Sequence, residues 1–336
     1  MCGIVGIAGS MPVADRLVGA LSRLEYRGYD SAGIATVHGG VLERRRAVGK
    51  LVNLSDLLVH EPLVGKAGIG HTRWATHGAP TVHNAHPHRA GPVAVVHNGI
   101  IENFRELRAE LSAAGFSFES ETDTETVALL TRHHMDQGMP PREAAAATLA
   151  RLNGAFALCF LFEGEEDLLI AARKGSPLAV GHGEGEMFVG SDAIALAPFT
   201  DRITYLEEGD SAVITRAGVE VRDAGGRLAN RPEARISIDA TRIEKGGHRH
   251  FMAKEIAEQP VIAADALRHY LGADRQSLNL PETLDFSKVS RLVIVACGTA
   301  SLAGAVAKYW FEQIAGLPVE VDIASEFRYR DPVFLP

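Results

Sequence analysis

The chain opens with Met1 and Cys2, followed by an apolar, glycine-rich stretch at residues 3–9. Such a stretch favours a buried strand, which would hold this end of the chain still. If Met1 is removed, as the small side chain of Cys2 permits, one residue carries both a thiol and a free α-amine. These titrate near about 8.5 and about 8, so each is partly in its reactive form at neutral pH, with nucleophile and base side by side. On this feature alone, an ordinary first strand remains the alternative.

Composition bounds the class of protein. A length of 336 residues predicts about two domains, and 46% hydrophobic with 23% charged residues is typical of a soluble globular protein. The net charge of −8 argues against a nucleic-acid-binding surface, and no apolar run approaches the ~18 residues that cross a membrane. Cys2, Cys159 and Cys297 have no paired spacing. We therefore expect a reducing compartment, the cytoplasm.

Residues 2–222 are predicted to form one domain, dense in short strand and helix signals. A helical face is indicated within residues 13–24, a helix is expected at 101–114, and Thr122 is a candidate cap for another, with Glu125 three residues on. Many short strands flanked by helices predict a layered α+β domain. The expected strands are at 31–37, 41–48, 66–73, 93–97, 155–162, 167–172, 187–190 and 211–215.

A polar stretch without periodicity, residues 223–250, is predicted to be a linker. Residues 251–336 differ in pattern, with a long helix containing Pro260, a strand at 292–296, a helix at 301–315 and a strand at 318–323. This order predicts one β-α-β unit of a parallel sheet. Because one such unit is too small for a doubly wound domain, we expect only the start of an α/β domain here.

Several strings of this chain are specific to a known family. They are Cys2-Gly3-Ile4, LEYRGYDSAG from residue 24, HTRWATHG from residue 71, NAHPH at 84–88, HNG from residue 97 and EFRYR at 326–330. Together they resemble the class II glutamine amidotransferases, which are N-terminal-nucleophile hydrolases. The resemblance implies a four-layer αββα fold for the first domain, a sugar isomerase (SIS) domain after it, and no cofactor.

Glutamine is a zwitterion, so a selective pocket needs a cation for its carboxylate and an anion for its ammonium. Arg73 offers a bidentate fork that suits a carboxylate. Asp123 stands at a predicted helix start, where its carboxylate can face a pocket, and the resemblance implies that it contacts the ammonium. A surface salt bridge for Arg73 and a second helix cap for Asp123 are the alternatives.

Asn98 and Gly99 are candidate donors to the oxyanion that forms when the Cys2 thiolate attacks an amide. Asn98 can supply a side-chain N–H, and Gly99 a backbone N–H where glycine lets the main chain approach closely. The α-amine of Cys2 would act as the general base and then protonate the departing ammonia. The alternative for Asn98-Gly99 is a tight turn after the strand at 93–97.

The resemblance assigns further residues around this site. Trp74, Thr76 and His77 are implied to line and close over the glutamine site, while Arg27 would order the loop behind the nucleophile. His86 resembles a mobile-loop histidine that gates the site. A core aromatic for Trp74 and a solvated loop histidine for His86 remain alternatives.

Six of the fourteen histidines fall between positions 71 and 97, which raises the question of a metal site. Their spacing matches no zinc pattern and no cysteine lies nearby, so we expect no metal there. The amidotransferase motifs already include several of these histidines.

Residues 297–301, Cys-Gly-Thr-Ala-Ser, follow a strand and open a helix, a geometry that can bind phosphate through backbone N–H groups. The resemblance makes Gly298, Thr299 and Ser301 phosphosugar-binding candidates; Ala300 stands where the family has serine, and a plain β-α turn is the alternative. It also implies fructose 6-phosphate as ammonia acceptor, glucosamine 6-phosphate as product and a homodimer at full length.

Two alternative functions remain open. The chain could belong to another class II amidotransferase, such as amidophosphoribosyltransferase or asparagine synthetase, or to a non-enzymatic phosphosugar-binding protein. The isomerisation residues would lie beyond this chain.

Overall fold

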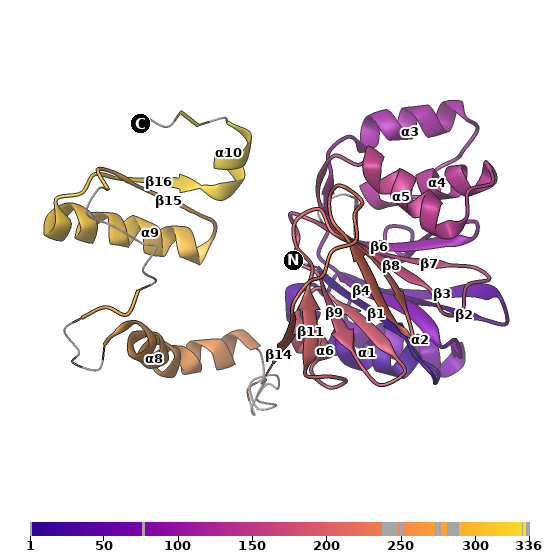
Figure 1. The fold of residues 1–336 in the computed structure, drawn as a ribbon, viewed down its shortest axis with the longest axis horizontal. Helices are drawn as coiled ribbons and strands as arrows, with labels where there is room; N and C mark the ends of the chain where they lie inside the picture. The colour runs from indigo at the N-terminus through magenta and orange to yellow at the C-terminus, as the bar shows by residue number, and fades with distance from the viewer. Residues whose placement is uncertain are drawn as a thin grey trace. The chain divides into compact units, whose positions relative to one another are not determined.

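The computed structural model describes residues 2–75, 78–236, 248, 251–272, 274, 277–280, 289–330 and 332–333. It divides into two compact units, Met1–Lys254 and Glu255–Pro336, with the division inside helix α8 (Phe251–Tyr270). Figure 1 shows the ribbon. Within the described ranges, no helix combines the length and the apolar character needed to cross a membrane.

Two antiparallel sheets form the centre of the first unit. The larger has eight strands in the order β14-β11-β9-β10-β1-β4-β2-β3, and the smaller has six in the order β13-β12-β8-β7-β6-β5. The strands are β1 Gly3–Ala8, β2 Ser31–His38, β3 Val41–Val48, β4 Ala67–Arg73, β5 His88–Ala90, β6 Val93–Ile101, β7 Gly154–Phe162, β8 Leu169–Lys174, β9 Ala179–His182, β10 Met187–Gly190, β11 Arg202–Tyr205, β12 Ser211–Thr215, β13 Gly218–Arg222 and β14 Glu233–Arg235.

Helices cover the outer face of each sheet (Figure 1). Apolar residues of α1 (Ala14–Ser22), α2 (Leu51–His60) and α6 (Ala193–Leu196) are buried against the larger sheet. Those of α3 (Phe104–Ala113), α4 (Asp123–Asp136) and α5 (Pro141–Arg151) are buried against the smaller one. Each sheet thus buries one face against helices, which leaves its other face for the second sheet.

The inner faces of the two sheets pack on each other in a third apolar core. Ile4 and Ile69 of the larger sheet meet Val96 and Leu161 of the smaller one there, all fully buried. A Cβ at Gly6 of β1 would lie 3.2 Å from the Cys159 sulfur, so glycine lets β1 approach the opposite sheet closely. The predicted fold class, a four-layer αββα domain, is confirmed.

The strand predicted at 93–97 extends further than its sequence pattern indicated. β6 runs through Asn98 and Gly99 to Ile101 and pairs with β7 over its whole length. The interpretation of Asn98-Gly99 as a tight turn is therefore wrong. Gly99 has φ +128°, and a Cβ there would lie 2.0 Å from the Ala155 carbonyl oxygen, so this approach of β7 requires glycine. The helix expected at 101–114 begins three residues later, at Phe104.

The start of α4 is capped as predicted. The Thr122 hydroxyl accepts from the Glu125 backbone N–H at 3.4 Å. The Glu125 carboxylate accepts instead from the backbone N–H groups of Glu119 and Ser120, both at 2.7 Å, which ties the incoming loop to the first turn. Asp123, the first residue of α4, is consequently held in a fixed position.

The second unit contains the predicted β-α-β order. β15 (Leu292–Ala296) and β16 (Val319–Ile323) are parallel neighbours. Between them lie α9 (Thr299–Trp310) and a π-helical turn, Phe311–Ala315, and after them α10 (Ala324–Tyr329).

Part of the segment predicted as a linker, residues 223–250, belongs to the first unit, because β14 pairs with β11 and extends the larger sheet. Residues 237–247, 249 and 250 of this segment lie outside the described residues.

Candidate active site

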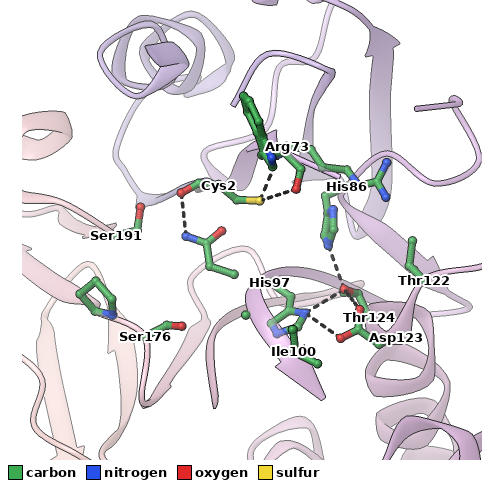
Figure 2. Close-up of a pocket in the computed structure, with 14 residues that line it drawn as sticks. Cys2, Arg73, His86, His97, Ile100, Thr122, Asp123, Thr124, Ser176 and Ser191 are labelled. Atoms are coloured by element: carbon green, nitrogen blue, oxygen red, sulfur yellow. Dashed lines mark hydrogen bonds and ion pairs between the residues drawn. The ribbon is translucent and has the colours of Figure 1, made fainter. Parts of the chain in front are cut away.

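A cavity of about 330 Å³ lies in the first unit, where the two sheets meet the start of α4. Figure 2 shows the side chains around it. The sequence-predicted residues that line it are Cys2, Arg73, Trp74, His86, Asn98, Gly99 and Asp123. Lining residues that sequence reasoning did not assign to the site are His97, Ile100, Thr122, Thr124, Ser176, Pro177 and Ser191.

Cys2 stands at the entrance to β1, where its thiol faces the end of β4. The Trp74 backbone N–H donates to the Cys2 sulfur at 3.2 Å, and the thiol donates to the Trp74 carbonyl oxygen at 3.5 Å. Ser191 anchors the same strand, because its hydroxyl accepts from the Ile4 N–H at 3.0 Å and its own N–H donates to the Ile4 carbonyl. The thiol is therefore held within the cavity wall (Figure 2).

Burial raises the pKa of the Cys2 thiol above its usual value, and the nearby Asp30 carboxylate adds to this rise. The Trp74 N–H and the Arg73 charge act in the opposite direction but do not outweigh burial. The thiol is therefore protonated at neutral pH. A nucleophilic role would require a base to take its proton at the moment of attack.

Asn98 and Gly99 approach Cys2 from the other sheet. The Asn98 side-chain amide donates to the Cys2 carbonyl oxygen at 3.0 Å, so the amide nitrogen lies on the side of the nucleophile. An amide N–H₂ group has two protons, so the second remains for an incoming oxygen.

Arg73 ends β4, and its side chain is only 4% exposed. Its two terminal nitrogens donate to the carbonyl oxygens of Ala79, at 3.3 Å, and Gly78, at 3.2 Å. One of them also lies 3.8 Å from an Asp30 carboxylate oxygen. The other Asp30 oxygen accepts from the Ala75 N–H. The guanidinium is thus fixed at the cavity and is no surface salt bridge.

Asp123 contributes a buried carboxylate at the opposite wall. It accepts from the Ile101 backbone N–H at 2.8 Å and lies 3.9 Å from His97 Nδ1. Its place at the helix N-terminus favours a negative charge. A cation and an anion therefore face one cavity from β4 and α4.

Four buried histidines form a cluster at the cavity: His86 and His97 line its wall, and His71 and His88 do not. The ring centroids of His71 and His86 are 4.1 Å apart. The Thr124 hydroxyl lies 3.0 Å from His86 Nε2 and 2.9 Å from His97 Nδ1. Burial lowers the pKa of His71 to about 3 and those of His86 and His88 well below the usual value. His86 is buried in the cavity wall and is not a solvated loop histidine.

The part of the chain described holds no group of three or more His, Cys, Asp or Glu side chains placed to bind a metal.

Two of the remaining predicted site residues, Thr76 and His77, lie outside the described residues. The backbone of Arg27 lies in a short 3₁₀ turn, Glu25–Arg27. In the second unit, Gly298 caps α9 with φ +60°, and Thr299 is the first residue of that helix. The Ser301 hydroxyl donates to the Gly298 carbonyl oxygen at 2.7 Å.

Comparison with known proteins agrees with this arrangement. A family model for the glutamine amidotransferase domain matches residues 71–198, and one for the SIS domain matches residues 285–334. A glutamine phosphoribosylpyrophosphate amidotransferase from B. subtilis shares the fold, with a TM-score of 0.61 and 20% identity over 95% of this chain and 65% of that one. The chain belongs to the class II glutamine amidotransferases of the N-terminal-nucleophile hydrolase fold.

Curated relatives narrow the family. Proteins named glutamine–fructose-6-phosphate aminotransferase (isomerizing) from Bradyrhizobium diazoefficiens and Brucella abortus are 60% and 61% identical to 98% of this chain, and one from Zymomonas mobilis is 57% identical to 99% of it. The alignment covers 55% of each relative. The particular family is thus that of the glutamine–fructose-6-phosphate aminotransferases, and the chain spans about half the length of these curated relatives. The family resemblance predicted from the motifs is confirmed.

Proposed function

We propose that the first unit, once Met1 is removed, hydrolyses glutamine to glutamate and ammonia through a thioester on Cys2. One observation carries the proposal: a thiol, an amide donor, a guanidinium and a carboxylate line a single cavity of about 330 Å³. That size suits a small amino acid, and the opposed charges suit a zwitterion.

Arg73 would bind the α-carboxylate of glutamine and Asp123 its ammonium. Both groups are already fixed by hydrogen bonds, so little ordering is left for the substrate to induce. Trp74, Thr76 and His77 would close over the bound molecule and exclude water, with Arg27 ordering the loop behind Cys2 and His86 helping to gate the entrance.

In the chemical step the α-amine of Cys2 takes the thiol proton, and the sulfur attacks the side-chain amide carbon. The C=O electrons move to oxygen, where Asn98 and Gly99 donate to the oxyanion. As the oxyanion collapses, the C–N bond breaks and the amine proton passes to nitrogen, which leaves as ammonia. Water then attacks the thioester, the C–S bond breaks, and glutamate and the free thiol result.

In the whole protein, the ammonia would be transferred to fructose 6-phosphate to give glucosamine 6-phosphate, with no cofactor. We assign the glutaminase to residues 2–222 together with strand β14, which extends its larger sheet from within the segment 223–250, and the start of the SIS domain to 251–336. Gly298, Thr299 and Ser301 would contribute to the sugar-phosphate site. The three free thiols support a reducing cytoplasm, and the family supports a homodimer.

The test is glutamate release from glutamine by the purified chain, after its mass has established that Met1 is absent. Cys2→Ala removes the nucleophile, and Cys297→Ala, at an exposed cysteine, is the matched control for loss of a thiol. We expect release by the parent and the control and none by Cys2→Ala. Stimulation by fructose 6-phosphate would support the sugar-phosphate site. No release by the parent would refute the proposal and favour a non-enzymatic binding protein.

A further inference from the structure

His71, a residue that the mechanism above does not use, makes two hydrogen bonds beside the nucleophile. It lies on β4, is 0% exposed and is not among the residues that line the cavity. Its Nε2 atom lies 3.0 Å from the His97 carbonyl oxygen and 3.0 Å from Asn98 Oδ1. A carbonyl oxygen only accepts, so Nε2 must carry the ring proton.

This proton also determines which way the Asn98 amide faces. The amide has His71 Nε2–H on one side and the Cys2 carbonyl oxygen, an acceptor, on the other. Only one orientation satisfies both neighbours, with oxygen toward His71 and nitrogen toward Cys2. The opposite orientation would set donor against donor and acceptor against acceptor in a partly buried wall of the cavity.

We propose that His71 is a positioning residue that locks the Asn98 amide with its N–H₂ group toward Cys2, where the oxyanion develops. The inference rests on the glutaminase proposed above. His71 acts only through Asn98, and it matters to turnover because an oxyanion donor stabilises the transition state only if it is in place before attack.

The environment of His71 keeps the ring in the required form. Burial holds its pKa at about 3, so the imidazole stays neutral throughout the physiological range. Its Nδ1 atom is buried and makes no hydrogen bond within the described part of the chain. A side chain that offers a donor only at the Nε2 position would therefore preserve all the hydrogen bonds that His71 makes in the described structure.

A double-mutant cycle tests this role on the intact chain. Asn98→Ala should lower kcat for glutamate release by about 10²–10³-fold. His71→Leu, which removes the donor, should lower kcat by about 10–100-fold and leave KM for glutamine nearly unchanged. His71→Gln, whose amide nitrogen can take the place of Nε2, should restore most of the loss. In His71→Leu/Asn98→Ala the His71 change should cost nothing further, because its only route to the chemistry is gone.

Three results would overturn the inference. The losses of the two single variants could multiply in the double variant, His71→Leu could change KM rather than kcat, or His71→Gln could be as slow as His71→Leu. If the leucine variant does not fold, nitrogen NMR of the parent protein decides, since the inference requires a neutral His71 with its proton on Nε2. A doubly protonated ring or an Nδ1–H tautomer would contradict it. Absence of glutamate release by the parent would instead refute the proposed glutaminase, and the NMR result would still show whether His71 carries the Nε2 proton that orienting Asn98 requires.

Discussion

The buried histidine cluster should make the first unit sensitive to mild acid. His71, His86 and His88 are neutral in the folded protein, because burial lowers their pKa values, that of His71 to about 3. In the unfolded chain a histidine titrates near about 6.5. Below that pH the unfolded state binds more protons than the folded state, so stability is present above about 6.5 and is lost as the pH falls toward the folded pKa.

The size of the loss follows from the number of buried rings. Each histidine that is neutral when folded and protonated when unfolded costs about 1.4 kcal/mol per pH unit, or about 2 kcal/mol between pH ~7 and ~5. The three together cost at most about 6 kcal/mol over that interval. A typical domain has a free energy of unfolding of only about 5–15 kcal/mol, so protonation of the unfolded chain should remove a large part of it.

Urea unfolding at pH ~7 and ~5 measures this loss. Trp310→Phe, at an exposed residue of the second unit, leaves Trp74 as the fluorescent probe of the first unit. In this background His88→Gln, which keeps a donor for Thr122, should reduce the acid loss by about one third. His38→Gln, at an exposed residue, is the matched control. A free energy of unfolding that stays constant from pH ~7 to ~5 would refute the reasoning.

Three further outcomes follow from the site and its sheets. Gly99→Ala would place a Cβ 2.0 Å from a carbonyl oxygen of β7 at positive φ, and should lower the unfolding free energy by more than about 2 kcal/mol in thermal or urea unfolding; native-like stability would contradict it. Arg73→Lys keeps a charge but loses the planar fork, so KM for glutamine should rise at least about 10-fold in glutamate-release kinetics, and an unchanged KM would exclude Arg73 as the carboxylate ligand. Burial raises the pKa of Cys159 to about 12, so peptide mapping after iodoacetamide treatment near pH ~7.5 should find Cys2 alkylated, at a rate that rises with pH, and Cys159 unmodified; the reverse pattern would be inconsistent with the burial described here.

The alternation and motif patterns predicted much of the fold because they are local. The strands at 31–37 and 41–48 appear as β2 and β3, and the β-α-β order of the second unit is as expected. β9 and β11, of four residues each, were not predicted, because pairing within the larger sheet decides their conformation. α2 was not predicted, although Leu51, Leu54 and Leu58 repeat with helical spacing.

In the site too, residues that belong to local motifs were predicted, and residues brought to the cavity by long-range pairing were not. Cys2, Arg73 and Asn98 were predicted to belong to one site, and they line one cavity. Ser176 and Ser191 carry no motif and reach the cavity only through sheet pairing. The interpretation of Asn98-Gly99 as a turn was wrong because β7, more than fifty residues later in the chain, holds this dipeptide extended.

The nucleophile and its proposed oxyanion donor belong to different sheets, with Cys2 entering β1 and Asn98 carried by β6. The distance over which the reaction takes place is therefore set by the thickness of the apolar layer between the sheets. Gly6 keeps that layer thin opposite Cys159. A methyl group added there, at a residue that does not line the cavity, would move Cys2 and Asn98, the two halves of the proposed catalytic site, apart. The rate of glutamate release should therefore depend on how tightly the two sheets pack on each other. Variants that loosen this apolar layer should lose activity before they lose their structure.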